Sequence, residues 1–224
     1  DALDQWQEAP SIAPSITYPS VWHVSGGRRL LLYRVAGHLG YWVVRLSDDG
    51  DIWRPEETII DFDRKPRDEA DRWAGSYLGV CPSRDGRSLH IGLTWWDERH
   101  NAHPRYRFRR DLLTRYNLYY LRLDLDTLRM TALDGAELPR PLNRSAARRC
   151  LVLETGDELT NFPTVAAGPD DEPLLLAPVS EGDPWRCRFR FFRPGPEAAA
   201  WSAAALPQTD NTWSASRLWF DADG

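Results

Sequence analysis

The chain has 224 residues, a formal net charge of -5 and 42% hydrophobic residues, which is enough apolar material for a folded core. Its acidic balance argues against nucleic acid as a partner, because nucleic-acid-binding domains usually present a net basic face. The longest apolar runs, such as Leu30-Leu31-Leu32-Tyr33, have the length of a strand and are too short to span a membrane. Three cysteines without a Cys-x-x-Cys spacing predict neither a disulfide framework nor a bound metal.

The first predicted unit covers roughly residues 15–65 and consists of four short strands. An aromatic-led strand beginning at Tyr18 is followed by the turn Ser25-Gly26-Gly27 and by a second strand through Leu30. Two further strands, at about 41–46 and 52–60, are joined by Ser47-Asp48-Asp49-Gly50. Four short antiparallel strands joined by tight polar turns are typical of one blade of a β-propeller.

The same pattern returns in a second unit, at about residues 74–140. Tyr77 lies as far after Tyr18 as Gly86 lies after Gly27, so the opening aromatic and the turn recur in register. The later strands of this unit are predicted at about 116–124 and 128–133.

A third unit covers roughly residues 160–206, and a further aromatic strand with its turn begins at about 212–224. Phe162 opens the third unit. Leu174 follows Phe162 by the same number of residues as Leu30 follows Tyr18. Its later strands are predicted at about 185–192 and 201–206. The strand in 212–224 has no returning partner, which would leave an unpaired sheet edge.

These repeats predict an all-β fold. We expect residues 1–224 to form a single partial β-propeller domain, with about three four-stranded blades and the first strand of a fourth. We expect the chain to be cut from a larger propeller, whose remaining blades come from the rest of the chain or from another subunit.

The predicted binding residues lie around the long connection between the second and third strands of the second unit. Trp95, Trp96, Arg115 and Asn117 flank this basic and aromatic segment, which could hold an anionic poly- or oligosaccharide. Guanidinium groups would pair with carboxylate or sulfate, and aromatic rings would stack on the sugar. The alternative is a solvated charged loop or a contact between blades.

Two sets of motifs resemble known propeller families. Tyr18-Pro19-Ser20, Leu32-Tyr33-Arg34 with Gly37, Leu89-His90-Ile91 with Thr94-Trp95, and Tyr116-Asn117-Leu118-Tyr119-Tyr120 resemble the BNR-4 group. Ser47-Asp48-Asp49-Gly50-Asp51-Ile52-Trp53 resembles the Asp-box turn of sialidase-like propellers, one residue short of the usual spacing. The Asp-box is a structural turn, so it indicates the fold and not the substrate.

The resemblance to the BNR-4 group implies a function as well as a fold. That group includes ulvan lyases and rhamnose-glucuronate lyases, which implies a polysaccharide lyase that cleaves uronate-containing glycans by β-elimination. It also implies an extracellular or periplasmic location, and no cofactor is expected. Lyase-like members often carry Asn-His ahead of an aromatic strand, where this chain has Asn117-Leu118.

A uronate lyase must neutralise the carboxylate, remove the C5 proton and protonate the leaving oxygen. We expect Arg34 or Arg115 to meet the carboxylate, His38 or His90 to act as base, and Tyr119 to act as acid. A metal held by His100 and His103 with Asp97 or Glu98 is a minor alternative, because that spacing is nonspecific.

The rivals to a lyase come from other classes. A noncatalytic propeller that binds glycans or proteins is favoured by Leu118 and by the lack of a tight catalytic motif. The other rivals are a structural module completed by another subunit and a sialidase-like enzyme.

Overall fold

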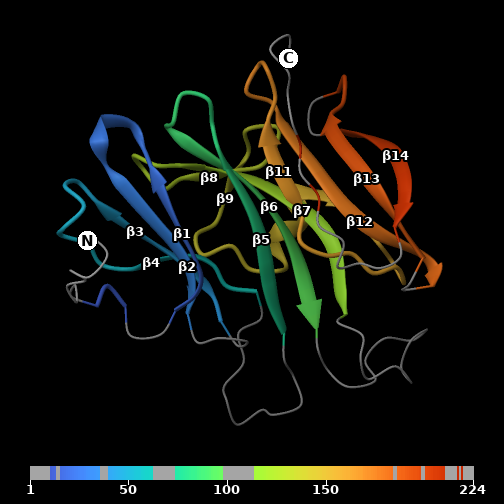
Figure 1. Ribbon diagram of the computed structural model, residues 1–224, viewed down its shortest axis with the longest axis horizontal. Helices are drawn as coiled ribbons and strands as arrows, with labels where there is room; N and C mark the ends of the chain where they lie inside the picture. The colour runs from blue at the N-terminus through green and yellow to red at the C-terminus, as the bar shows by residue number, and fades with distance from the viewer. Residues whose placement is uncertain are drawn as a thin grey trace, which may run out of the picture.

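The computed structural model describes residues 11–13, 16–35, 40–62, 74–97, 114–183, 186–197, 200–209, 216 and 218. These residues form three antiparallel β-sheets that stand side by side in chain order (Figure 1). In the described ranges the helices are short 3-10 turns, and none of them is long and apolar enough to cross a membrane.

The first sheet has four strands in the order β1 (Ile16–His23), β2 (Arg29–Val35), β3 (Trp42–Ser47) and β4 (Glu57–Ile60). The short helix η2 (Ser25–Gly27) makes the turn between the first two strands. The predicted strand at 52–60 is shorter than expected, because residues before β4 form the turn after Ser47 and pair only through a bridge between Ser47 and Trp53.

That turn after Ser47 closes as the Asp-box pattern predicts. The Asp49 carboxylate accepts backbone hydrogen bonds from Asp51 and Ile52, and the Ser47 hydroxyl accepts one from Gly50. A second Ser-x-Asp-Gly turn, at residues 83–86, joins the first two strands of the next sheet. The same local chemistry therefore serves two different connections.

The second sheet has six strands where the sequence predicts four. Its path runs through β5 (Ala74–Pro82), β6 (Ser88–Asp97), β7 (Arg115–Asp124), β8 (Met130–Thr131) and β9 (Glu137–Leu138). The helix η4 (Ala146–Cys150) then leads into β10 (Leu151–Leu153), which returns to pair with β7. The predicted strand at 128–133 shrinks to two residues because β8 and β10 share the outer side of β7.

The third sheet has four strands in the order β11 (Thr164–Ala167), β12 (Pro173–Asp183), β13 (Arg186–Pro194) and β14 (Trp201–Thr209). The strands β13 and β14 begin and end within a few residues of the ranges predicted for them, 185–192 and 201–206. The strand predicted at 212–224 lies outside the described residues, apart from Ser216 and Leu218.

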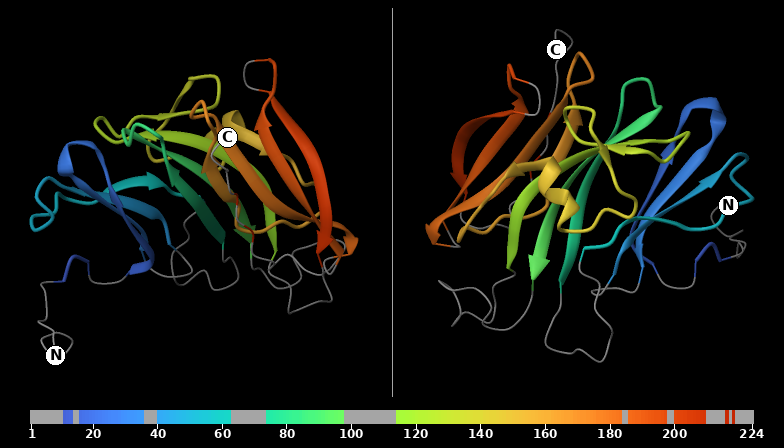
Figure 2. Two further views of the ribbon diagram at one scale, coloured as in Figure 1. Left: turned by 45° about the horizontal axis from the view of Figure 1, so that its top comes forward. Right: turned by 180° about the vertical axis from the view of Figure 1, so that it is seen from behind.

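Apolar side chains fill the space between neighbouring sheets, and the views of Figure 2 show the three sheets following one another side by side. Leu32 and Val44 of the first sheet join Ile91 and Leu121 of the second in one buried cluster. Leu118 and Tyr120 pack with Leu175 and Phe192 in another. This arrangement is consistent with part of a propeller-like fold.

Gly79 and Gly92 permit the close approach of the second and third sheets. They are cross-strand partners on β5 and β6. A Cβ atom at Gly79 would lie 1.9 Å from the Pro163 carbonyl oxygen, and one at Gly92 would lie 2.9 Å from Leu175. The absence of a side chain at both positions brings the beginning of β11 against β5.

Candidate functional site

A group of arginine and aromatic side chains gathers where the three sheets meet. We call it the arginine–tyrosine cluster and define it as Tyr18, Arg34, Tyr77, Arg115 and Phe162. Tyr18, Tyr77 and Phe162 are the opening aromatic residues of the three repeats: Tyr18 lies on β1, Tyr77 on β5, and Phe162 just before β11. Their shared register brings segments that are distant in sequence to one place.

The strand ends position the two arginines. Arg34 lies one residue before the end of β2, and Arg115 is the first residue of β7. Both therefore lie at the end of the sheets from which the β2–β3 and β6–β7 connections leave. This is the end at which the sequence predicts ligand binding.

The rings and guanidinium groups are interleaved. The Arg34 guanidinium carbon lies 4.8 Å from the Tyr18 ring centroid and 4.7 Å from that of Tyr77. The Arg115 guanidinium carbon lies 4.4 Å from Tyr77 and 5.1 Å from Phe162. Tyr77 thus lies between both cations, and each cation–π contact contributes on the order of 1 kcal/mol.

Buried polar contacts hold the cluster in place. Trp42 donates from its indole N–H to the Ser76 carbonyl at 3.1 Å, which ties the first sheet to the residue before Tyr77. Trp96 is fully buried with its ring centroid 6.0 Å from that of Tyr77. Arg115 donates to the Asn161 side-chain oxygen at 2.6 Å.

Arg34 is the unusual member of the cluster. Its side chain is 1% exposed, and its Nε donates to the Thr17 hydroxyl at 3.3 Å. Within the described part of the chain, its Nη1 has no hydrogen-bond partner and no carboxylate forms an ion pair with it. A buried cation in this state is unfavourable unless an anion reaches it.

Tyr18 forms the outer side of the cluster, since 49% of its surface is exposed. Partial burial raises the pKa of Tyr18, and neighbouring Tyr77 raises it further, while Arg34 and Arg115 act in the opposite direction. The hydroxyl therefore stays protonated at neutral pH and can donate a hydrogen bond or a proton.

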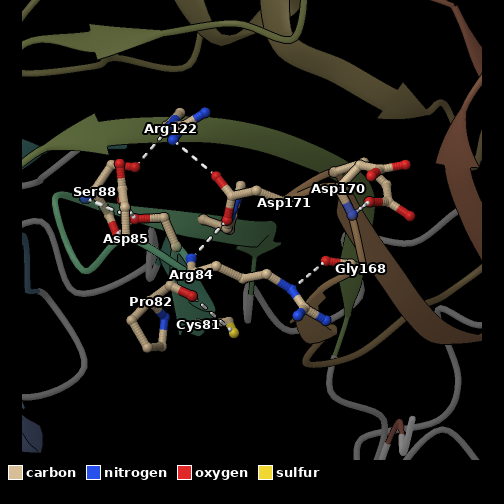
Figure 3. Close-up of polar contacts among 12 residues, drawn as sticks. Cys81, Pro82, Arg84, Asp85, Ser88, Arg122, Gly168, Asp170 and Asp171 are labelled. Carbon is tan, nitrogen blue, oxygen red and sulfur yellow. Dashed lines mark hydrogen bonds and ion pairs between the residues drawn. The ribbon is translucent and has the colours of Figure 1, made fainter. Parts of the chain in front are cut away.

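His90, predicted as a base, lies in a different polar group. It is fully buried, with Nδ1 2.8 Å from the Tyr120 hydroxyl and Nε2 3.3 Å from the Asp171 carboxylate. Asp171 also accepts from Arg122 at 2.9 Å and from the Arg84 backbone at 2.7 Å (Figure 3). Burial lowers the pKa of His90, so the ring is neutral at pH 7.

Tyr119, Asn117 and Trp95 form a third group. Asn117 donates from its amide nitrogen to the Tyr119 hydroxyl at 3.1 Å. Trp95 packs against Tyr116, with ring centroids 5.1 Å apart, and lies beneath the Arg144 guanidinium at 4.0 Å. Adjacent residues of a strand point to opposite faces, which separates Trp95 from Trp96.

The predicted site residues are therefore divided among three places. The structure brings Arg34, Arg115 and Trp96 together around Tyr77. It places His90 in one further group, and Tyr119, Asn117 and Trp95 in another. His38 and the side chains of the metal alternative lie outside the described residues.

Sequence reasoning did not assign Tyr18, Tyr77, Phe162 and Asn161 to the site. A signal for the three aromatic residues was present, because the first strands of neighbouring propeller blades lie close to one another. Residues at one register of those strands are therefore expected to converge. Asn161 carried no such signal.

Comparison with known proteins gives a likeness of fold. No protein-family model and no curated protein sequence matches the chain. A solved ulvan lyase, described as a new family of polysaccharide lyase PL25, matches 89% of this chain with a TM-score of 0.74 and 18% identity. The fold of the chain is similar to that of an ulvan lyase.

Two further structures agree with this likeness. A PL25 ulvan lyase bound to -[GlcA(1-4)Rha3S]- matches 89% of the chain with a TM-score of 0.73 and 17% identity. The polysaccharide lyase Uly1 matches 84% of the chain with a TM-score of 0.59 and 13% identity. The chain spans 45% of the PL25 ulvan lyases and 40% of Uly1, which is less than half of each.

Proposed function

We propose that the protein binds a uronate-containing polysaccharide at the arginine–tyrosine cluster and cleaves it by β-elimination. The three sheets would act as blades of a partial propeller that carries the cluster. The observation behind the proposal is the buried Arg34 guanidinium, whose Nη1 has no hydrogen-bond partner among the described residues. The likeness of the fold to ulvan lyases supports a sugar carboxylate as the anion that it receives.

The chemistry asks three things of the site. A base removes the C5 proton, the C4–O bond breaks as a C4=C5 double bond forms, and the leaving oxygen takes up a proton. Guanidinium groups at the carboxylate would stabilise the negative charge that develops there as the C5–H bond breaks. Arg34 and Arg115, on either side of Tyr77, are suited to this role.

Tyr18 is suited to the proton donor. It is the most exposed residue of the cluster, and its hydroxyl carries a proton at neutral pH. Tyr119, the donor predicted from sequence, lines a separate pocket. His38, four residues after Arg34, keeps its predicted role as base.

The direct test incubates the protein with a panel of glucuronate-containing polysaccharides and follows the ultraviolet absorbance of an unsaturated uronate product. We expect the absorbance to rise, and we expect Tyr18→Phe to slow the rise by roughly 100-fold while binding persists. Phenylalanine keeps the ring beside Arg34 and removes only the hydroxyl. Arg54→Ala, at an exposed arginine paired with Asp48, is the matched control and should leave the rate unchanged.

A second function, glycan binding without cleavage, is favoured by Asn117-Leu118, where lyase-like relatives often carry a histidine. Glycan-array binding with no ultraviolet signal from any polymer of the panel would select this function and reject the lyase.

A further inference from the structure

A pocket of about 430 Å³ lies beside β7, separate in its lining from the arginine–tyrosine cluster. Six of its lining residues matter here: Asn117, Tyr119, Arg144, Arg148, Leu151 and Glu154. The segment that contains η4 and β10 closes it, and Leu151 pairs with Tyr119 across the strands. The pocket is therefore made by the part of the second sheet that departs from four strands.

The polar floor of the pocket is fixed by hydrogen bonds. Asn117 has a left-handed φ of 54°, and its side-chain oxygen accepts from the Thr155 backbone N–H at 3.0 Å. Its amide nitrogen donates to the Tyr119 hydroxyl at 3.1 Å. Asn117 is thus held at both ends, and the φ value is one that asparagine tolerates better than most residues.

Tyr119 lines this pocket and carries a hydroxyl that can donate a hydrogen bond. The residue is 3% exposed, its ring packs edge-on against Phe62, and the described residues offer its proton no acceptor. Burial raises the pKa of Tyr119, the Asn117 amide and Arg144 oppose that rise, and Glu154 adds to it. A buried hydroxyl that receives one hydrogen bond and donates none is ready to donate to a ligand.

The rim of the pocket carries both signs of charge. Arg144 and Arg148 are exposed, and Arg144 is steadied by the Trp95 ring 4.0 Å away. Glu154, also exposed, supplies a carboxylate. Two guanidinium groups match an anionic group, while the carboxylate and the tyrosine hydroxyl match sugar hydroxyls.

We infer that this pocket is a second binding site for one acidic sugar unit, which bears a carboxylate or a sulfate. Arg144 and Arg148 hold the acidic group, Tyr119 donates to a ring substituent, and Glu154 accepts from a hydroxyl. The choice of a sugar rests on the proposed function. The site would hold a unit of the same polymer away from the reacting bond and so increase affinity for long chains over short ones.

The test uses isothermal titration of the full chain carrying Arg34→Met, which removes one of the two cations of the cluster and leaves the lining of the pocket unchanged. We expect glucuronate and a glucose 6-sulfate probe to bind this variant, and glucose to bind at least tenfold more weakly. Adding Arg144→Ala and Arg148→Ala should weaken glucuronate binding by roughly tenfold or more. Adding Arg149→Ala instead is the matched control. Arg149 is an exposed arginine of η4 beside Arg148 that does not line the pocket, so its substitution should leave glucuronate binding unchanged.

Tyr119→Phe gives a second arm, since it keeps the packing against Phe62 and removes the hydroxyl, which is the proposed donor to the ligand and also the acceptor of the Asn117 amide. It should weaken binding of both probes several-fold while the protein still unfolds in one cooperative thermal transition. Equal binding of glucuronate by the Arg144→Ala, Arg148→Ala variant and its control would overturn the inference. The proposed function fails separately, through the absence of unsaturated product from the unaltered protein.

Discussion

Two groups that contain arginine and aromatic side chains lie between neighbouring sheets, and they differ in how the charge of the arginine is compensated. In the group around Asp171, His90 and Arg122 share a carboxylate that also accepts a backbone hydrogen bond. In the arginine–tyrosine cluster, Arg34 has rings on both sides and no carboxylate of the described residues. The first group is satisfied within the protein, whereas we propose that an anion from outside completes the second.

The satisfied group is expected to serve stability, and the arginine–tyrosine cluster is expected to serve binding. A satisfied network ties the second sheet to the third and contributes stability. A desolvated cation that is held by two aromatic rings and one hydroxyl adds less stability than a fully paired one, and it can interact strongly with an anion because water is excluded. Substitutions in the two groups should therefore affect different measurements.

The largest expected effect is on ligand affinity. Arg34→Met should weaken binding of a glucuronate-containing oligosaccharide by about 100-fold, because it removes the cation that would meet the carboxylate. The free energy of unfolding should change by no more than about 1 kcal/mol, since the substitution also removes an uncompensated buried charge. Calorimetric binding and denaturant unfolding measure the two quantities. A loss of stability without a loss of affinity would make Arg34 a structural residue.

The opposite result is expected for the satisfied group. Asp171→Gly removes the carboxylate and accepts the left-handed φ of 61° at this residue. It should lower the free energy of unfolding by about 2 kcal/mol, because the His90 ring and the Arg84 backbone lose an acceptor. Oligosaccharide affinity should remain within about twofold of the original protein. If Asp171→Gly lost as much affinity as Arg34→Met, both groups would belong to one binding site and the distinction would be wrong.

A smaller effect comes from pH. The pKa of His90 is lowered by burial, although Asp171 and Asp85 oppose the shift and Arg122 reinforces it. His90 in the unfolded chain therefore takes up a proton near pH 6.5, whereas His90 in the folded chain stays neutral until a lower pH. The contribution of His90 to the free energy of unfolding is thus fully present above pH 6.5 and falls as the pH decreases below it. We expect a loss of about 1 kcal/mol on going from pH 7.5 to pH 5.5.

His90→Gln should flatten this dependence, because glutamine can bond to Tyr120 or Asp171 without titrating. Denaturant unfolding of both proteins at the two pH values measures it. The same slope in the variant and the original protein would assign the proton to another group.

The sequence predicted the large features of the fold because they depend on local patterns. Turn residues such as Gly27 and Gly86 mark hairpins, and the matched register of Tyr18 and Tyr77 marks the repeat. The return of β10 to β7 was missed, since it depends on a pairing between residues 119 and 151 that no local pattern encodes.

The site was predictable in part for the same reason. Arg34 or Arg115 was predicted to meet the carboxylate, and Trp96 and Arg115 were predicted to flank the binding segment; the structure gathers all three around Tyr77. The separation of Trp95 from Trp96 follows from strand alternation alone. The partners of His90 could not be predicted, because Asp171 reaches it from a different sheet.

The most direct test of the central claim compares a glucuronate-containing oligosaccharide with its carboxyl-reduced counterpart, for the original protein and for Arg34→Met. If Arg34 meets the carboxylate, the original protein should bind the acid at least about 30-fold more tightly than the reduced sugar, and Arg34→Met should lose most of that preference. An equal preference in both proteins would contradict the account, because the carboxylate would then be held elsewhere.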